Sequence, residues 1–220
     1  MTYDAKHTNP PPCFNNEILT KLYHAMNADD GEGCCLDGHR QLRCQEIGAS
    51  VLVLLTNESV PRMLLTKRSR HLKAHAGEIG FVGGKRDESD ANAAQTALRE
   101  AFEEVGLKTN HAHIIGYLPC QTAKSGVSVR PVVAVVEPSE VRYLVASELE
   151  IERIIWEELD QFIWTPPHEI IMCYDDQPPF ATPCWTLGAE MVWGLTGRII
   201  ASLVRVGFGV KYDWYYRLVK

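Results

Sequence analysis

The sequence lacks the features of a membrane, nucleic-acid-binding or zinc-cysteine protein. None of its 220 residues lies in an apolar run long enough to cross a membrane, and its start has no apolar signal core. A formal net charge of −6 leaves no basic field for nucleic acid. The seven cysteines include no C-x-x-C spacing, and their odd number leaves at least one unpaired. We therefore expect an intracellular protein in a reducing compartment, cytoplasmic by default, with mitochondria and peroxisomes left open.

The composition that is present is typical of one globular domain with extensions, since 45% of the residues are hydrophobic and 23% are charged. We expect an N-terminal extension over residues 1–45, with a short amphipathic helix at 15–26. The main domain is expected over 46–208, followed by a C-terminal tail over 209–220. Within the domain, the Pro-rich segment 165–185 is predicted to be an irregular insertion.

Strand and helix patterns alternate along the main domain. The strands are predicted at 49–56, 62–68, 112–119, 127–136 and 150–156, with a Gly-rich short strand and loop from 77 to 90. Long helices are predicted at 91–105, capped by Ser89 or Asp90 and ended by Gly106, and within 188–206. Strands before, between and after two helices indicate an α+β fold with one mixed sheet between helices.

The segment "LREAFEEVGL" places Glu100, Glu103 and Glu104 on one face of the first long helix, because successive helical residues are about 100° apart. Their repulsion costs about 0.2–0.5 kcal/mol, and the helix dipole disfavours acids near this end by about 0.3–1 kcal/mol. Such local conflicts are typical of functional sites, and clustered carboxylates suit Mg²⁺ or Mn²⁺. The opposite face carries the residues expected to pack on the sheet, which are Leu98, Phe102 and Val105.

An ordinary solvated charged face, partly neutralised by Arg99, explains the helix alone equally well. The preceding loop "GGKRD" favours the functional interpretation, because Gly83 and Gly84 allow close backbone approach. Lys85 and Arg86 add cations beside the acids. Glycines, cations and a metal site are the parts needed to hold a pyrophosphate.

Residues 83–107 resemble the Nudix box, G-x5-E-x7-R-E-U-x-E-E-x-G-U, in which U is apolar. The second half matches at Arg99, Glu100, Glu103, Glu104, Gly106 and Leu107, with Ala101 in the U position. The first half departs from the box, since residues 85–98 make a spacer of 14 where the box has 13. It also lacks the early glutamate, and the nearest acids are Asp87 and Asp90.

The segment from Leu64 to Gly84 resembles the additional signature of the coenzyme A pyrophosphatase branch, L-L-T-x-R-[SA]-x3-R-x3-G-x3-F-P-G-G. The matching residues are Leu64, Leu65, Thr66, Arg68, Ser69, Gly77, Phe81, Gly83 and Gly84. Lys73 replaces an arginine of the signature and keeps its charge but not its bidentate fork. Val82 replaces a proline, so the loop loses a fixed φ angle.

The resemblance implies a Nudix-type α/β/α sandwich that hydrolyses coenzyme A, or a derivative, to 3′,5′-ADP and 4′-phosphopantetheine or its acyl form. The partner would be this small-molecule substrate, with no membrane and no nucleic acid, and the oligomeric state is left open. A first alternative is a Nudix hydrolase of NADH, ADP-ribose or a capped RNA. A second is a binding module without catalysis, against which the intact set of glutamates argues.

The resemblance also implies roles for individual residues. Glu100 and Glu104 would hold Mg²⁺ or Mn²⁺, as the matching positions do in the family. The candidate catalytic residues are Glu103, as a base or a further ligand, and Arg99, which would orient the carboxylates. The candidate substrate-binding residues are Arg68, Lys73, Gly84 and Lys85. For the three cations among these, ordinary solvated charge is the alternative interpretation.

Overall fold

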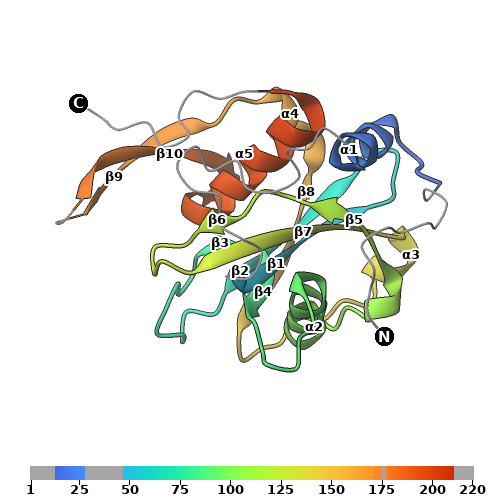
Figure 1. Ribbon diagram of the computed structural model, residues 1–220, viewed down its shortest axis with the longest axis horizontal. Coiled ribbons are helices and arrows are strands. Elements are labelled where there is room, and N and C mark those ends of the chain that lie inside the picture. The colour runs from blue at the N-terminus through green and yellow to red at the C-terminus, as the bar shows by residue number, and fades with distance from the viewer. Residues whose placement is uncertain (1–12, 28–46, 175–176, 211–220) are drawn as a thin grey trace.

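A mixed sheet runs through the centre of the molecule and separates two layers of helices (Figure 1). The computed structural model describes residues 13–27, 47–174 and 177–210. The elements in chain order are α1 (Glu17–Asn27), β1 (Ile47–Thr56), β2 (Arg62–Arg68), β3 (Ile79–Gly80), β4 (Val82–Lys85), α2 (Ala93–Val105), η2 (Thr109–His111), β5 (Ala112–Tyr117), β6 (Gln121–Thr122), β7 (Ser128–Val136), α3 (Pro138–Val141), β8 (Ile151–Glu158), α4 (Leu159–Trp164), β9 (His168–Tyr174), β10 (Gln177–Leu187), β11 (Glu190–Val192) and α5 (Gly194–Phe208).

Strands β1 and β7 form the parallel centre of the main sheet, and all nine residues of β7 are buried. The strand order is β3-β2-β1-β7-β5, while β4 pairs with β1, β6 with β7 and β8 with β2. Each of these other pairings is antiparallel. The predicted mixed sheet between helices is therefore confirmed, and so is the α+β class.

Alternate residues of β1 enter two separate hydrophobic cores, because neighbouring side chains of a strand point to opposite faces. Leu52 and Leu54 pack with α2 on one face of the sheet. Val53 and Leu55 pack on the other face, in the core that includes residues of α1, α4 and α5. In Figure 1, α2 accordingly lies on the opposite side of the sheet from α1 and α5.

Helix α2 begins at Ala93, two residues later than its predicted start. The side chain of Asn92 accepts the backbone N–H of Gln95 at 3.0 Å, so neither Ser89 nor Asp90 is the N-cap. Asp90 is buried and binds other groups of the loop. The predicted end is confirmed, since Gly106 adopts φ 70° and donates to carbonyls of the last turn.

The predicted apolar face of α2 is wrong in part. Val105 is fully buried, but Phe102 is 57% exposed. The face that meets the sheet carries Ala97, Ala101, Glu104 and Val105 instead. Alanines allow the helix to lie close to the strands, and Glu104 enters the interior because polar partners meet it there.

The prediction that residues 165–185 are irregular is also wrong. Strands β9 and β10 form an antiparallel hairpin that projects from the molecule in Figure 1, and β11 pairs with β10. Prolines at 179 and 183 concealed β10, since proline removes a ladder donor. Trp185 is buried here, donating Nε1–H to the carbonyl of Thr165 at 3.0 Å.

The remaining predicted elements agree with the structure, apart from one boundary. Helix α1 and the strands β1, β2, β5, β7 and β8 are confirmed within a few residues. Helix α5 begins at Gly194, later than the predicted 188, because β11 takes residues 190–192. Most of the expected extension over 1–45 and of the tail over 209–220 lies outside the described residues. Within the described part of the chain, no helix has the length and apolarity needed to cross a membrane.

Candidate active site

Two adjacent glycines of β4 set the distance between the sheet and the glutamate helix. A Cβ atom at Gly83, whose φ is 151°, would lie 2.4 Å from the carbonyl oxygen of Ser50. A Cβ atom at Gly84 would lie 2.5 Å from the carboxylate carbon of Glu100. Gly83 therefore lets β4 pack against β1, and Gly84 lets the carboxylate of Glu100 rest against the backbone of β4.

The carboxylate of Glu104 is buried at the junction of α2, β2 and β4, with only 3% of the residue exposed. Its Oε2 accepts the backbone N–H of Gly83 at 3.2 Å, and its Oε1 lies 3.4 Å from Nη1 of Arg68. Burial raises the pKa of Glu104 from 4.5 to about 7, although the Gly83 N–H and the Arg68 charge oppose the shift. Without a bound cation, this group therefore titrates near neutral pH.

Glu100 lies one helical turn before Glu104 and faces the same region. Its side chain is 16% exposed, and Nη1 of Arg99 lies 2.9 Å from its Oε1. Burial raises the pKa of Glu100, and the ion pair with Arg99 opposes this rise. The charges of Glu103 and Glu150 contribute in the same direction as burial. Two partly desolvated carboxylates thus share one small region, which disfavours their charged forms.

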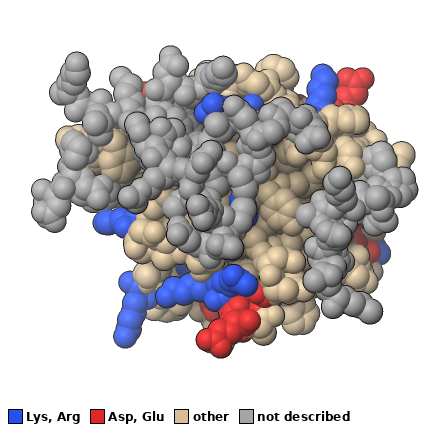
Figure 2. Space-filling model, viewed as in Figure 1, with Lys and Arg blue, Asp and Glu red and all other residues tan. Residues whose placement is uncertain are grey.

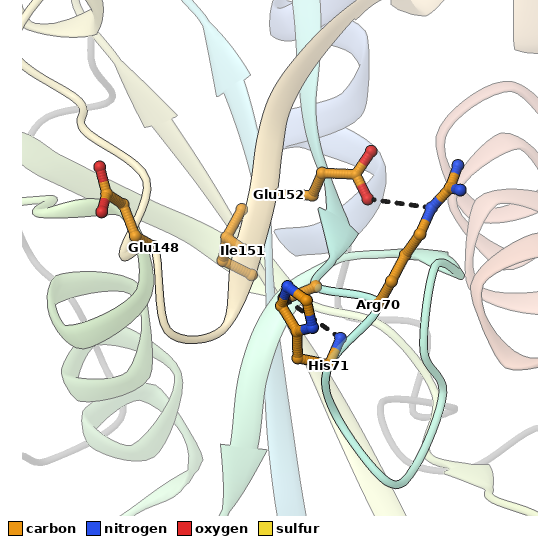
Figure 3. A pocket seen from close by; sticks show the side chains of 6 residues that line it. Arg70, His71, Glu148, Ile151 and Glu152 are labelled. Atoms are coloured by element: carbon orange, nitrogen blue, oxygen red, sulfur yellow. Dashed lines mark hydrogen bonds and ion pairs between the residues drawn. The ribbon is translucent and has the colours of Figure 1, made fainter.

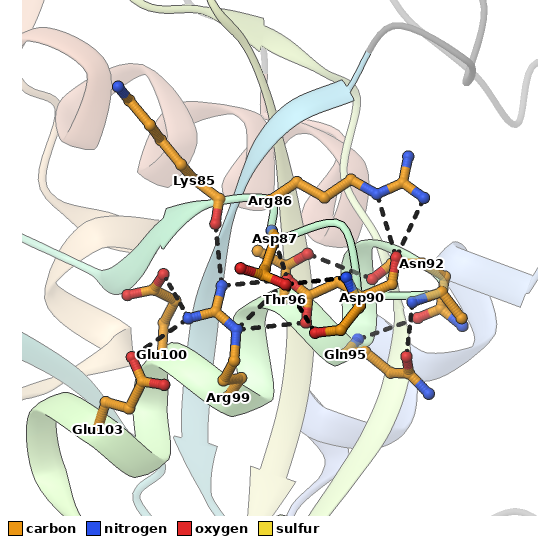
Figure 4. Close-up of polar contacts among 12 residues, drawn as sticks. Lys85, Arg86, Asp87, Asp90, Asn92, Gln95, Thr96, Arg99, Glu100 and Glu103 are labelled. Carbon is orange, nitrogen blue, oxygen red and sulfur yellow. Dashed lines mark hydrogen bonds and ion pairs between the residues drawn. The ribbon is translucent and has the colours of Figure 1, made fainter.

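Arg99 joins the helix to the loop that precedes it (Figure 4). Its Nη2 lies 3.1 Å from Asp90 Oδ2 and donates to the carbonyl of Lys85 at 2.9 Å. Its Nη1 contacts Glu100 and lies 3.2 Å from Glu103 Oε2. One guanidinium therefore contacts the loop and two of the three glutamates. Glu103 itself is 54% exposed.

Asp90 is the buried anchor of this arrangement, and sequence reasoning assigned it only as a cap or as a nearby acid. Burial by itself would raise the pKa of Asp90, but hydrogen bonds from Arg99, the Asp87 N–H and Thr96 hold it below its usual value. The side chain of Arg86 donates to the carbonyl of Asp90 at 3.1 and 3.2 Å. Asp90 is one of the acids nearest to the missing early glutamate of the box, and this position was the sequence signal for its pairing with Arg99.

Glu150 is a further acid of the site that sequence reasoning did not single out. Its carbonyl accepts the N–H of Ser69 at 2.8 Å, and its carboxylate lies 3.9 Å from Nη2 of Arg68. Its charge helps to raise the pKa of both Glu100 and Glu104. The alternating acids of the sequence "ELEIE" were the available signal, because alternate residues lie on one side of an extended segment.

The four predicted substrate-binding residues occupy different surroundings. Arg68 lies between Glu104 and Glu150, and Gly84 lies against Glu100. The side chain of Lys85 is exposed and extends away from Arg99 in Figure 4. Lys73 is exposed in the loop between β2 and β3, where it forms no hydrogen bond or ion pair with another described residue. The structure therefore brings Arg68 and Gly84 to the carboxylates but not the Lys73 side chain.

Charges of both signs meet on this side of the molecule. In the space-filling view, basic and acidic side chains lie side by side near the lower edge, on the side of the sheet that carries α2 (Figure 2). Within the described residues, no three acidic, histidine or cysteine side chains converge closely enough to enclose a metal ion by themselves.

Comparison with known proteins places this chain in a family. The sequence model of the NUDIX domain matches residues 46–182. The Escherichia coli (strain K12) protein named Uncharacterized Nudix hydrolase NudL is 35% identical over 163 residues, which cover 74% of this chain and 83% of the relative. Its namesake from Yersinia enterocolitica is 32% identical over 169 residues, covering 71% and 80% of the two chains.

Among solved structures, a C. elegans Ap4A hydrolase in a binary complex has a TM-score of 0.44 at 21% identity, covering 52% of this chain and 83% of that one. A MutT/nudix family protein from Enterococcus faecalis has a TM-score of 0.43 at 16% identity, with 86% and 73% covered.

The chain belongs to the NUDIX domain family. It is a Nudix hydrolase, an enzyme that acts on phosphoric anhydrides. Nudix hydrolases generally need divalent metal cations and bind small nucleotide substrates.

Proposed function

We propose that this Nudix hydrolase cleaves the pyrophosphate of coenzyme A, or of its derivatives, to 3′,5′-ADP and 4′-phosphopantetheine or its acyl form. The observation that carries the proposal is the meeting of two motifs. Arg68 belongs to the segment that resembles the coenzyme A signature, and its guanidinium lies 3.4 Å from Glu104 of the Nudix box. The signature segment therefore borders the site at which a pyrophosphate would react.

Mg²⁺ or Mn²⁺ is the cofactor in this proposal, with Glu100 and Glu104 as its protein ligands. Both carboxylates are largely buried, and the pKa of each is raised by that burial, so a divalent cation would relieve the cost of ionising them. The Arg68 guanidinium now supplies positive charge at Glu104. When bound, the cation would neutralise phosphoryl oxygens and make the phosphorus easier to attack.

The residues of the chain then position the reactants and receive a proton. Water adds to one phosphorus atom, the anhydride P–O bond breaks, and the proton of the water passes to a carboxylate. We assign Glu103 as the carboxylate that accepts this proton. Its side chain is half-exposed, and its Oε2 lies 3.2 Å from Nη1 of Arg99. Arg99 is the positioning residue, because it fixes Glu103 and Glu100 together. Arg68 would donate one or more of its N–H groups to a substrate phosphate.

Lys73 and Lys85 are retained as candidate phosphate contacts, because both lie in exposed parts of the segments that border the carboxylates. Each would have to swing its flexible side chain toward the substrate. Lys85 is the nearer candidate in the chain, since its own carbonyl binds Arg99 at 2.9 Å. We propose an intracellular setting, where coenzyme A compounds are available as substrates.

The test is a product assay with equal concentrations of coenzyme A, its thioesters, NADH, ADP-ribose and a capped RNA in Mg²⁺ or Mn²⁺. We expect the highest kcat/KM for coenzyme A or a thioester, with 3′,5′-ADP among the products. Glu104→Gln should abolish turnover and leave the fold intact. The control Glu17→Gln, on the exposed surface of α1, should retain both turnover and the fold. A higher kcat/KM for NADH, ADP-ribose or capped RNA would contradict the substrate assignment.

A further inference from the structure

A shallow pocket of about 330 Å³ is lined in part by the residues that directly follow Arg68 in the chain (Figure 3). It lies between the turn that follows β2 and the start of β8. Its lining residues are Ser69, Arg70, His71, Glu148, Ile151 and Glu152. In Figure 3, Glu148 lies on one side of the pocket and Arg70 with Glu152 on the other, with Ile151 and His71 between them.

The residues that line the pocket directly adjoin, along the chain, residues at the proposed pyrophosphate site. Ser69 follows Arg68 directly, and its N–H donates to the carbonyl of Glu150 at 2.8 Å. Arg68 in turn contacts the carboxylates of Glu104 and Glu150. Arg68 and Glu150 therefore connect the lining of the pocket to the site of Glu104.

The charges of the pocket make it unsuitable for a second phosphate. Nε of Arg70 lies 3.4 Å from Glu152 Oε2, so the cation is already paired with a carboxylate. Glu152 also lies 3.5 Å from the buried ammonium of Lys67. Glu148 forms no ion pair or hydrogen bond with any other residue that the structure describes, so its negative charge faces the pocket rim uncompensated. A phosphate there would meet a like charge.

The lining instead fits a flat, neutral group with a hydrogen-bond donor at its edge. Ile151, which is 2% exposed, is the single apolar side chain of the lining. The guanidinium of Arg70 and the ring of His71 are planar groups on which an aromatic base can stack. A carboxylate can only accept hydrogen bonds, so Glu148 selects a donor such as an amino group. The volume is at the lower end of the usual range of about 300–1,000 Å³, which suits a base better than a whole nucleotide.

We propose that this pocket binds the adenine base of the substrate, and that Glu148 accepts a hydrogen bond from its 6-amino group. The inference rests on the proposed function, because it places the pyrophosphate at Glu100 and Glu104. It adds a specificity-determining residue outside both motifs of the sequence. Hypoxanthine carries a carbonyl oxygen in place of the amino group, so its position 6 offers Glu148 an acceptor and no donor.

The experiment measures binding of 3′,5′-ADP and 3′,5′-IDP to the full chain by calorimetry. We expect 3′,5′-ADP to bind about tenfold or more tightly, as a hydrogen bond to a charged group allows. Glu148→Gln should reduce this preference to roughly threefold or less, because an amide can both donate and accept. Glu17→Gln is the matched control and should keep the wild-type preference.

Equal affinities of the wild-type chain for the two nucleotides would overturn the inference, and so would an unchanged preference in Glu148→Gln. Neither measurement requires turnover, so the result is independent of the product assay. A chain that prefers 3′,5′-ADP through Glu148 but cleaves NADH best would support the base pocket and contradict the coenzyme A assignment. A chain that cleaves coenzyme A and its hypoxanthine analogue with equal kcat/KM would also contradict the base pocket alone.

Discussion

A guanidinium nitrogen of Arg68 lies 3.4 Å from the carboxylate of Glu104, of which only 3% is exposed. The pair joins the end of β2 to the last turn of α2. Arg68 opposes the rise in the pKa of Glu104, but burial is the larger effect, and the pKa reaches about 7. In the absence of a cation, the native chain therefore holds a proton that the unfolded chain has already lost at pH 6.

The first prediction concerns stability against pH in EDTA. Because the pKa of Glu104 is about 7 in the folded chain and 4.5 in the unfolded one, its contribution is complete below pH 4.5 and is lost as the pH rises through 7. We expect the free energy of unfolding to fall by about 3 kcal/mol at most over this range. Urea unfolding at pH 5 to 8 measures it, and Glu104→Gln should flatten the dependence. An equal slope in both proteins would refute the assignment.

The second prediction removes the cation of the pair. Arg68→Met should raise the pKa of Glu104 further, because the charge that stabilises the ionised form is lost. The loss of stability with pH should then occur at higher pH than in the wild-type chain. Arg62→Met is the control, since Arg62 pairs with Glu58 at the other end of β2. A transition that stays at the same pH in Arg68→Met would show that the pair is not formed in solution.

The third prediction separates the two glycines of β4. Gly83→Ala should destabilise the chain by about 1–3 kcal/mol, because its Cβ atom collides with the backbone of β1. Gly84→Ala should lower kcat more than it lowers stability. Its Cβ atom meets the carboxylate of Glu100, and that flexible side chain can move out of its place. Thermal unfolding and kcat measure the two effects. The reverse order of effects would contradict the geometry.

The fourth prediction concerns Arg99. Lysine has one compact ammonium, which cannot reach Asp90, Glu100 and Glu103 together. We expect Arg99→Lys to lower kcat/KM about 10-fold to 100-fold and to weaken Mn²⁺ binding, as loss of an orienting partner commonly does. Arg62→Lys, at a surface ion pair, should leave both unchanged. Wild-type Mn²⁺ affinity in Arg99→Lys would rule out an orienting role.

The fifth prediction tests the corrected face of α2. Phe102→Ala should change the free energy of unfolding by about 0.5 kcal/mol or less, since Phe102 is 57% exposed. Val105→Ala should cost about 1–3 kcal/mol, because Val105 is fully buried. Chemical denaturation of the two variants compares them directly. A larger loss for Phe102→Ala would restore the face predicted from the sequence.

The sequence predicted most of the sheet, because apolar runs such as those of β1 and β7 are typical of buried strands. It also predicted that Glu100 and Glu104 share a face, since helical periodicity is a local property. The hairpin of β9 and β10 was missed for the opposite reason. Its prolines weaken the local strand pattern, although its two strands pair across a short connection.

The inner contacts of the site could not be read from sequence either. Which side of α2 is buried depends on Gly83 and Arg68, which meet Glu104 from β4 and β2. Hydrophobicity alone assigned Phe102 to the core because it cannot anticipate a buried carboxylate with two partners. Glu150 and Glu148 were overlooked because their significance comes from a turn that the fold brings beside β2.

Ala97 and Ala101 are both fully buried where α2 meets the sheet. Because alanine side chains are small, these two residues set the distance between α2 and the sheet, and so the distance of Glu100 and Glu104 from β4. A larger residue at either position would lift the helix and carry both carboxylates with it, because they are parts of one rigid element. The spacing needed for chemistry is therefore a dimension of the core, and the smallest side chains in the helix define it.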